Sequence, residues 1–262
     1  EVIAPVRELE LTREWEQEYA AEQNLPVQAG NDGVWSIDTN LWSRSIEGGK
    51  LEDPEHVPNE NIYEWTANPT NRPSTEQITI GFEDGIPVSL NGQHHEPVEL
   101  ITQLNKQAGT HGVGRTDMME DRMLGLKVRE NYEHPGATTL LTAHEALEQL
   151  VLTKDERDFK RHVDAEWAQK AYEGLINHPL LTALEGFIQE TQSRVTGNVT
   201  IKFEGGRARP VSRESPYAAY SAGAASFNTS SVGSITQQDA TGIAKYHGFQ
   251  GRLATGIESD TE

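Results

Sequence analysis

The segment from His111 to Gly136 concentrates the residues that could do chemistry in this chain, and its sequence is HGVGRTDMMEDRMLGLKVRENYEHPG. Polar and apolar residues alternate from Asp121 to Val128, a pattern that predicts a β-strand with one buried face. Glu120 would lie just before this strand and Tyr132 just after it, so that a carboxylate and a phenol could point into a common pocket. The alternative is an ordinary strand whose charged side chains are solvated, as charge-rich runs usually are.

Two glycines flank Val113 near the start of this segment. Glycine lets backbone amides approach a ligand closely, and it also allows a turn with positive φ at no steric cost. A dinucleotide-binding fingerprint needs a third glycine where this chain has Asp117, and no suitable strand precedes the pair. The glycines therefore do not predict a dinucleotide site.

Histidines at two places raise the question of a metal site. His94 and His95 are adjacent, so their side chains point in opposite directions on an extended chain, and no third ligand stands at a suitable spacing. His144 and Glu145 begin a sequence like that of zinc proteases, but Glu148 occupies the position of the second histidine. The chain contains no cysteine, which excludes thiolate ligands, disulfides and cysteine nucleophiles. We therefore predict no metal site.

The overall composition limits the class of protein. A chain of 262 residues permits one large domain or two ordinary ones, with a core that needs no disulfide. No apolar run approaches the length of a membrane span, and the first residues do not form a secretory leader. We therefore expect a soluble, cytoplasmic protein with no membrane partner.

The net charge of −19 and the presence of only eight lysines argue against nucleic-acid binding, because Lys and Arg supply the affinity for phosphates. A strongly acidic surface keeps a protein soluble, while its self-repulsion destabilises the compact state. High salt shortens the Debye length and screens that repulsion. The hypothesis that follows is adaptation to a salt-rich cytosol.

The N-terminal residues predict one strand–helix step of a wound α/β sheet whose earlier strands are not in this sequence. Val2–Ala4 would end a strand, Thr12 would cap a helix over residues 13–25, and Pro26 would end that helix. Trp15 stands where a capping box needs Glu or Gln. This pattern suggests that the chain is a fragment.

Residues 29–60 are rich in Gly, Asn, Asp and Pro, which predicts a loop. Bulky side chains such as Trp42 imply that this loop folds back onto the body of the protein. Ser36 and Ser45 carry short hydroxyls that could grip a ligand carboxylate. The same hydroxyls could instead cap helices or face solvent.

The rest of the chain alternates between hairpins and helices. Turn glycines separate runs of alternating residues, and apolar residues at helical spacing mark the helices. We expect hairpins over 77–92 and 197–220, helices over 98–109 and within 138–194, and, after Tyr220, an extended arm that is ordered only if a partner covers it. Hairpins with helices between them predict an α+β fold, an antiparallel sheet with helices.

Five segments, in this order and at these separations, closely resemble the argininosuccinate synthase family: VIAPVRE, WSIDTNLWSRSIEGGKLEDP, GIPVSLNG, HGVGRTDMMEDRMLGLKVRENYEHPGATTLLTAH and SRESPYAAY. The resemblance covers roughly residues 1–220 and continues only faintly in QDATGI. It implies that residues 1–28 are the remnant of an α/β nucleotide-binding domain of the ATP-pyrophosphatase type. Residues 29–220 would be a synthetase domain for citrulline binding and multimerisation, and 221–262 a C-terminal arm that helps to build a homotetramer.

By this resemblance, the intact enzyme uses Mg-ATP to adenylate the ureido oxygen of citrulline, and the amine of aspartate then displaces AMP to give argininosuccinate. The matched segments put Ser36, Ser45, Glu120 and Tyr132 on citrulline-binding positions. A carboxylate suits the ammonium of citrulline, and hydroxyls suit its carboxylate and ureido groups. Such contacts orient the ureido oxygen, so no general base is assigned. The family's SGGLDTS phosphate loop is absent from this sequence, and no residue is assigned to ATP, Mg²⁺ or aspartate.

The sequence departs from the family at Asp121, where Asn is more frequent, and at Val128, where Ser is more frequent. Neither is a ligand position, but both lie near the predicted pocket. The alternative to an enzyme is a non-catalytic binding or oligomerisation module derived from the synthetase domain. The absence of the phosphate loop favours this alternative. An acidic hydrolase that uses Asp117 and Glu120 lacks a nucleophile or metal set.

Overall fold

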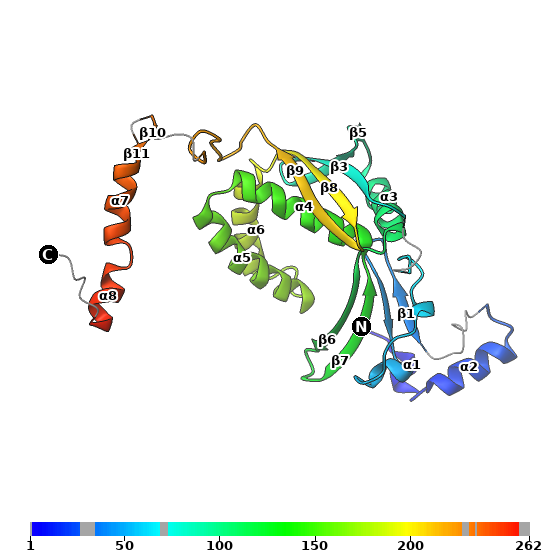
Figure 1. The fold of residues 1–262 in the computed structure, drawn as a ribbon. Coiled ribbons are helices and arrows are strands. Elements are labelled where there is room, and N and C mark those ends of the chain that lie inside the picture. Colours follow the sequence, from blue (N-terminus) through cyan, green and yellow to red (C-terminus); the bar gives the residue numbers. More distant parts are fainter. Residues whose placement is uncertain (1, 27–34, 69–72, 227–230, 234, 257–262) are drawn as a thin grey trace.

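Two antiparallel sheets and the helices around them make up most of the described part of the chain, which is residues 2–26, 35–68, 73–226, 231–233 and 235–256 of the computed structural model. This mixture of helices and antiparallel sheets agrees with the predicted α+β class. Figure 1 shows β3, β8 and β9 of one sheet above β1, β6 and β7 of the other.

The larger sheet contains five strands in the order β5-β4-β3-β8-β9, and all neighbouring pairs are antiparallel. Both predicted hairpins are present in it. Asp84 (φ 48°) and Gly85 (φ 80°) form the turn between β3 and β4, where a tight hairpin turn requires positive φ. The strands are β3 (Glu76–Glu83), β4 (Ile86–Leu90), β5 (Gln93–His94), β8 (Gly197–Glu204) and β9 (Arg207–Glu214).

The main hydrophobic core lies between this sheet and two helices, α3 (Pro97–Thr110) and α4 (Pro135–Val151). Both helices begin with proline, whose missing N–H costs nothing at the first helical position. Ile80 of β3 and Ile201 of β8 are completely buried, because alternate side chains of a strand point to the same face. The predicted helix over 98–109 is therefore confirmed.

The smaller sheet has the order β1-β2-β7-β6 and carries the chemically rich segment. The predicted strand over 121–128 is wrong, because residues 122–126 form the turn between two strands, of which one ends at Asp121 and the next begins at Lys127. The N–H of Arg122 donates to the carbonyl of Leu126 at 2.8 Å, and the exposed Leu124 lies at the tip. The alternating apolar residues of this segment are therefore not buried, although their pattern predicted a buried face. The strands are β1 (Ser36–Thr39), β2 (Arg44–Glu47), β6 (Arg115–Asp121) and β7 (Lys127–Glu133).

Residues 35–60, predicted to be part of a loop, instead contain a hairpin, a short 3-10 helix, η1 (Gly49–Glu52), and the first residue of a second one, η2 (Glu60–Ile62). Asn40 turns the chain between β1 and β2, and its side-chain oxygen accepts hydrogen bonds from the backbone N–H groups of Trp42 (2.8 Å) and Ser43 (3.0 Å). Pairing of β2 with β7, far away in sequence, stabilises this hairpin in a segment of turn-forming composition. Residues 29–34 of the predicted loop lie outside the described residues.

The N-terminal residues do not contain the predicted strand, since Val2–Ala4 are irregular and a short helix, α1 (Pro5–Glu8), follows them. The next helix, α2 (Arg13–Glu22), begins as predicted. Its N-cap is Thr12, whose hydroxyl accepts a hydrogen bond from the N–H of Trp15 at 3.3 Å. The helix ends three residues earlier than the predicted 13–25.

Two further helices, α5 (Lys154–Tyr172) and α6 (Pro179–Gln192), complete the predicted helical block and pack against each other.

The C-terminal arm is not simply extended. It contains a minimal hairpin, β10 (Ser231–Val232) with β11 (Ile235–Thr236), and two helices, α7 (Gln237–Tyr246) and α8 (Phe249–Thr255). Figure 1 shows α7 and α8 standing apart from both sheets. In the described residues, no helix is long and apolar enough to cross a bilayer.

The two glycines around Val113 form the connection from α3 to β6. Gly112 has a φ of 69° and Gly114 a φ of 90°. A Cβ atom on Gly114 would lie 2.6 Å from the backbone nitrogen of Pro135, so only glycine fits there. The glycines therefore serve a turn that brings β6 beside the start of α4.

Candidate functional site

The strand register brings the four predicted binding residues onto one face of the smaller sheet. Ser45 in β2 lies opposite Tyr132 in β7, and Tyr132 lies opposite Thr116 in β6. Residues two or four apart on a strand share a face, so Glu120 lies on the same face as Thr116. Ser36 belongs to this face as well, because its partner in β2 stands two residues after Ser45. We call the surface formed by Ser36, Ser45, Glu120 and Tyr132 the site face, and all four residues are partly buried in it.

Tyr132 and Glu120 are in direct contact, through strands arranged differently from the single strand that was predicted. The phenol of Tyr132 donates a hydrogen bond to Oε1 of Glu120. Burial raises the pKa of Tyr132 well above its usual range, and the hydrogen bond to Glu120 adds to this effect. The phenol therefore stays protonated and holds the carboxylate by donating to it.

Arg122 in the turn between β6 and β7 connects this pair to two more carboxylates. Its Nη1 lies 3.3 Å from Oε2 of Glu120, and its Nη2 lies 3.7 Å from Oε2 of Glu47. Nη2 also forms a close ion pair with Oε1 of Glu130. Tyr172, the last residue of α5, is a further polar partner of the guanidinium.

Glu130 is the most buried of these acids, with only 4% of its side chain exposed. Burial, with the neighbouring Glu47, raises the pKa of Glu130 to about 7, although Arg122 opposes the shift. This carboxyl group therefore gains or loses a proton near neutral pH. Sequence reasoning did not identify Arg122, Glu47 or Glu130, since each is an ordinary charge in a charge-rich run.

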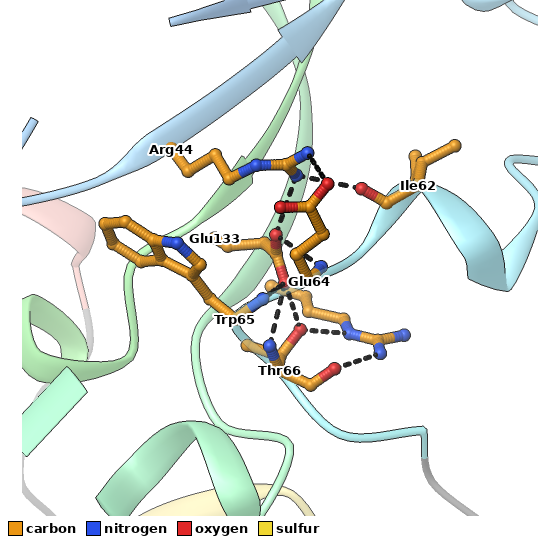
Figure 2. A network of polar contacts seen from close by, with 7 residues as sticks. Arg44, Ile62, Glu64, Trp65, Thr66 and Glu133 are labelled. Carbon is orange, nitrogen blue, oxygen red and sulfur yellow. Dashed lines mark hydrogen bonds and ion pairs between the residues drawn. The ribbon is translucent and has the colours of Figure 1, made fainter. Parts of the chain in front are cut away.

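The opposite face of the sheet is fixed by a buried carboxylate, that of Glu133, as Figure 2 shows. Its two oxygens accept hydrogen bonds from Nη1 of Arg44 (2.9 Å) and from three consecutive backbone N–H groups, those of Glu64 (3.0 Å), Trp65 (2.9 Å) and Thr66 (2.9 Å). The Thr66 hydroxyl donates a further bond at 2.7 Å. A buried charge is tolerated only with such complete pairing.

Two arginines attach the rest of the covering segment to the same face. Arg115 donates to the Thr66 hydroxyl at 2.7 Å and lies 3.9 Å from the centre of the Tyr63 ring. Arg129 pairs with Asp117 at 2.7 Å and donates to the carbonyl of His56 at 2.9 Å. The segment over residues 49–67 is thus bound to one side of the sheet, and the site face is on the other.

Two cavities in the body of the protein are lined by other residues. One of about 600 Å³ lies between residues 64–67 and α3, and one of about 400 Å³ lies between α3, α4 and β4. None of the four predicted residues lines either cavity. Among the described residues, no group of three or more His, Asp and Glu is arranged to hold a metal ion.

Comparison with known proteins gives consistent matches. Residues 35–254 match the family model described as the arginosuccinate synthase C-terminal domain. The argininosuccinate synthase of Haloquadratum walsbyi is 78% identical over 262 residues, which are 100% of this chain and 66% of that protein. The enzyme of the same name from Natronomonas pharaonis is 69% identical over 98% of this chain and 64% of its own length. The chain therefore spans about two thirds of the length of these relatives.

Proposed function

This chain belongs to the argininosuccinate synthase family, and on that premise we propose that it is the citrulline-binding part of an enzyme that condenses citrulline with aspartate. The reaction consumes Mg-ATP and yields argininosuccinate, AMP and pyrophosphate through a citrullyl-adenylate, as a step in arginine biosynthesis. The observation that carries this proposal is the contact of Glu120 with Tyr132 on the face that also bears Ser36 and Ser45.

The site face supplies the groups that citrulline requires. The Glu120 carboxylate accepts hydrogen bonds from the ammonium, and the hydroxyls of Ser36, Ser45 and Tyr132 serve the carboxylate and the ureido group. Because Glu120 rests against a protonated phenol, it is held in one orientation before the ligand arrives. These residues orient the ureido oxygen for attack on the α-phosphorus, and no proton transfer is assigned to them.

The domain organisation that goes with this function has three parts. Residues 29–220 form the synthetase domain, a boundary supported by the family match from residue 35. Residues 1–28 belong to the end of an ATP-pyrophosphatase-type α/β domain, of which α2 is the last helix. ATP, Mg²⁺ and aspartate are bound mainly by residues outside this chain.

Residues 221–262 form an arm for assembly into a homotetramer in the cytoplasm. Exposed apolar side chains on its helices support this role, since Ile243, Tyr246 and Leu253 are each more than half exposed. A non-catalytic binding or oligomerisation module is the alternative function for the chain.

An assay of the full-length protein distinguishes the two functions. With citrulline, aspartate and Mg-ATP, it should form argininosuccinate and AMP, and the chain of residues 1–262 alone should form neither. Argininosuccinate is measured by mass spectrometry, with citrulline omitted as the control. A full-length protein that forms no AMP under these conditions would contradict the proposed enzyme and favour the module.

A further inference from the structure

Arg122 is the cation at the centre of an acidic cluster on the site face. Its guanidinium lies within 4 Å of carboxylate oxygens of Glu47, Glu120 and Glu130, which come from β2, β6 and β7. Arginine suits this position because its planar guanidinium presents several N–H donors in fixed directions, whereas a lysine ammonium acts as a point charge. The arrangement fixes the position of Glu120 from the side opposite to Tyr132.

The cluster has more negative than positive charge, so its proton content matters. Oε2 of Glu130 is buried and has no hydrogen-bond donor among the described residues. The carboxyl group of Glu47 is close by, because the same Nη2 atom of Arg122 lies near carboxylate oxygens of both Glu47 and Glu130. Two carboxylates cannot bond to each other unless one carries a proton, and a shared proton would satisfy the buried oxygen.

We propose that Arg122 is a positioning residue of the citrulline site, which holds Glu120 toward Tyr132 while Glu47 and Glu130 share one proton beside it. With that proton, three carboxyl groups and one guanidinium leave a single net negative charge. One ammonium group of a bound amino acid neutralises it. This inference rests on the proposed function, because it names the residue that orients the ammonium-binding carboxylate.

The groups that face Glu130 come from every neighbouring element. Glu47 lies on β2, Glu120 on β6 and Arg122 in the turn, and Tyr172 of α5 interacts with the guanidinium. If Arg122 is removed, Glu120 loses its cationic partner and is repelled by the negative charge that Glu47 and Glu130 share. It then no longer has one preferred orientation, and the ammonium of citrulline is bound less tightly.

The test compares Arg122→Gln with Lys127→Gln in the full-length protein. Lys127 is a matched control, because it lies in the same hairpin, is 64% exposed and pairs only with Asp121 among the described residues. We expect Arg122→Gln to raise the citrulline KM about tenfold to a hundredfold, the range for loss of a charged hydrogen bond. The KM for ATP should not change, kcat should change much less than the citrulline KM, and Lys127→Gln should match the unaltered protein.

Further substitutions separate positioning from a merely structural role. In the triple variant Arg122→Gln/Glu47→Gln/Glu130→Gln the negative charge that Glu47 and Glu130 share is removed as well, so part of the citrulline affinity should return. Arg122→Lys should lie between Arg122→Gln and the unaltered protein, and it replaces Arg122→Gln as the test if the latter does not fold.

An unchanged citrulline KM in Arg122→Gln, or a triple variant that binds citrulline no better than Arg122→Gln, would overturn the inference. These results differ from failure of the proposed function, in which the unaltered full-length protein itself makes no argininosuccinate.

Discussion

Glu130 illustrates how the register of a strand decides the chemistry of one side chain. It stands in a charge-rich run where a solvated side chain is the usual outcome. Pairing of β2 with β7 instead buries it beside Glu47 and Arg122, and its pKa rises to about 7. The sequence indicated Glu120 and Tyr132 as a pair, because both flank one segment. It could not indicate Glu47, which reaches them only through strand pairing.

Replacement of Glu130 by Gln should change how stability depends on pH. Between about pH 5 and pH 7 the folded protein keeps the Glu130 proton that the unfolded chain releases, so the folded state loses stability as pH rises through this window. The amide of Gln does not titrate between pH 5 and pH 8, so this loss of stability is absent in the variant. The melting temperature of Glu130→Gln should therefore equal that of the unaltered protein near pH 5 and exceed it near pH 8.

Melting curves of the full-length protein at both pH values check this expectation, with Glu185→Gln, an exposed residue of α6, as the control. If Glu130→Gln and the unaltered protein differ by the same amount at pH 5 and pH 8, Glu130 does not titrate in this range.

At the scale of elements, the sequence predicted those parts in which local signals agree with tertiary structure. Gly85 and Gly205–Gly206 stand between alternating runs, and both hairpins of the larger sheet form there. The hairpin of β6 and β7 was missed because Met123, Leu124 and Leu126 imitate a buried face although they are exposed at its tip. The anchor at Glu133 was missed as well, since its backbone partners lie 67 to 69 residues earlier in the chain.

The Glu133 anchor gives a prediction about stability. Glu133→Gln replaces one accepting oxygen by an NH₂ group that faces backbone N–H donors, and it leaves Arg44 without its buried counter-ion. The free energy of unfolding should fall by about 3 kcal/mol or more, as for other buried pairs that lose one partner. Urea unfolding of the full-length protein measures it.

Glu64→Gln is the matched control for this change. Glu64 also pairs with Arg44, at 3.0 Å, but 68% of its side chain is exposed. Its loss should cost less than about 1 kcal/mol. Equal losses in the two variants would show that the buried carboxylate does not stabilise the sheet as described.

At the scale of the whole molecule, the acidic surface fits the relatives from the haloarchaea Haloquadratum walsbyi and Halobacterium salinarum. The net charge is −19, so the negatively charged side chains repel one another at low salt. About 1 M salt reduces the Debye length to about 3 Å and screens this repulsion. The melting temperature should therefore rise between about 0.1 M and 2 M KCl.

A variant with Glu14, Glu16 and Glu18 of α2 replaced by Gln should show a smaller rise, because these exposed side chains contribute to the repulsion. A melting temperature that stays constant or falls as KCl increases would exclude adaptation to high salt.

The citrulline KM of Glu120→Ala in the full-length protein tests the central claim most directly. Asp121→Ala is the matched control, because Asp121 is the next carboxylate in β6, points to the other face and is 77% exposed. Glu120→Ala should raise the citrulline KM at least tenfold and leave the KM for ATP close to that of the unaltered protein. The citrulline KM of Asp121→Ala should stay close to that of the unaltered protein. An unchanged citrulline KM in Glu120→Ala would contradict the assignment of the citrulline site to this face.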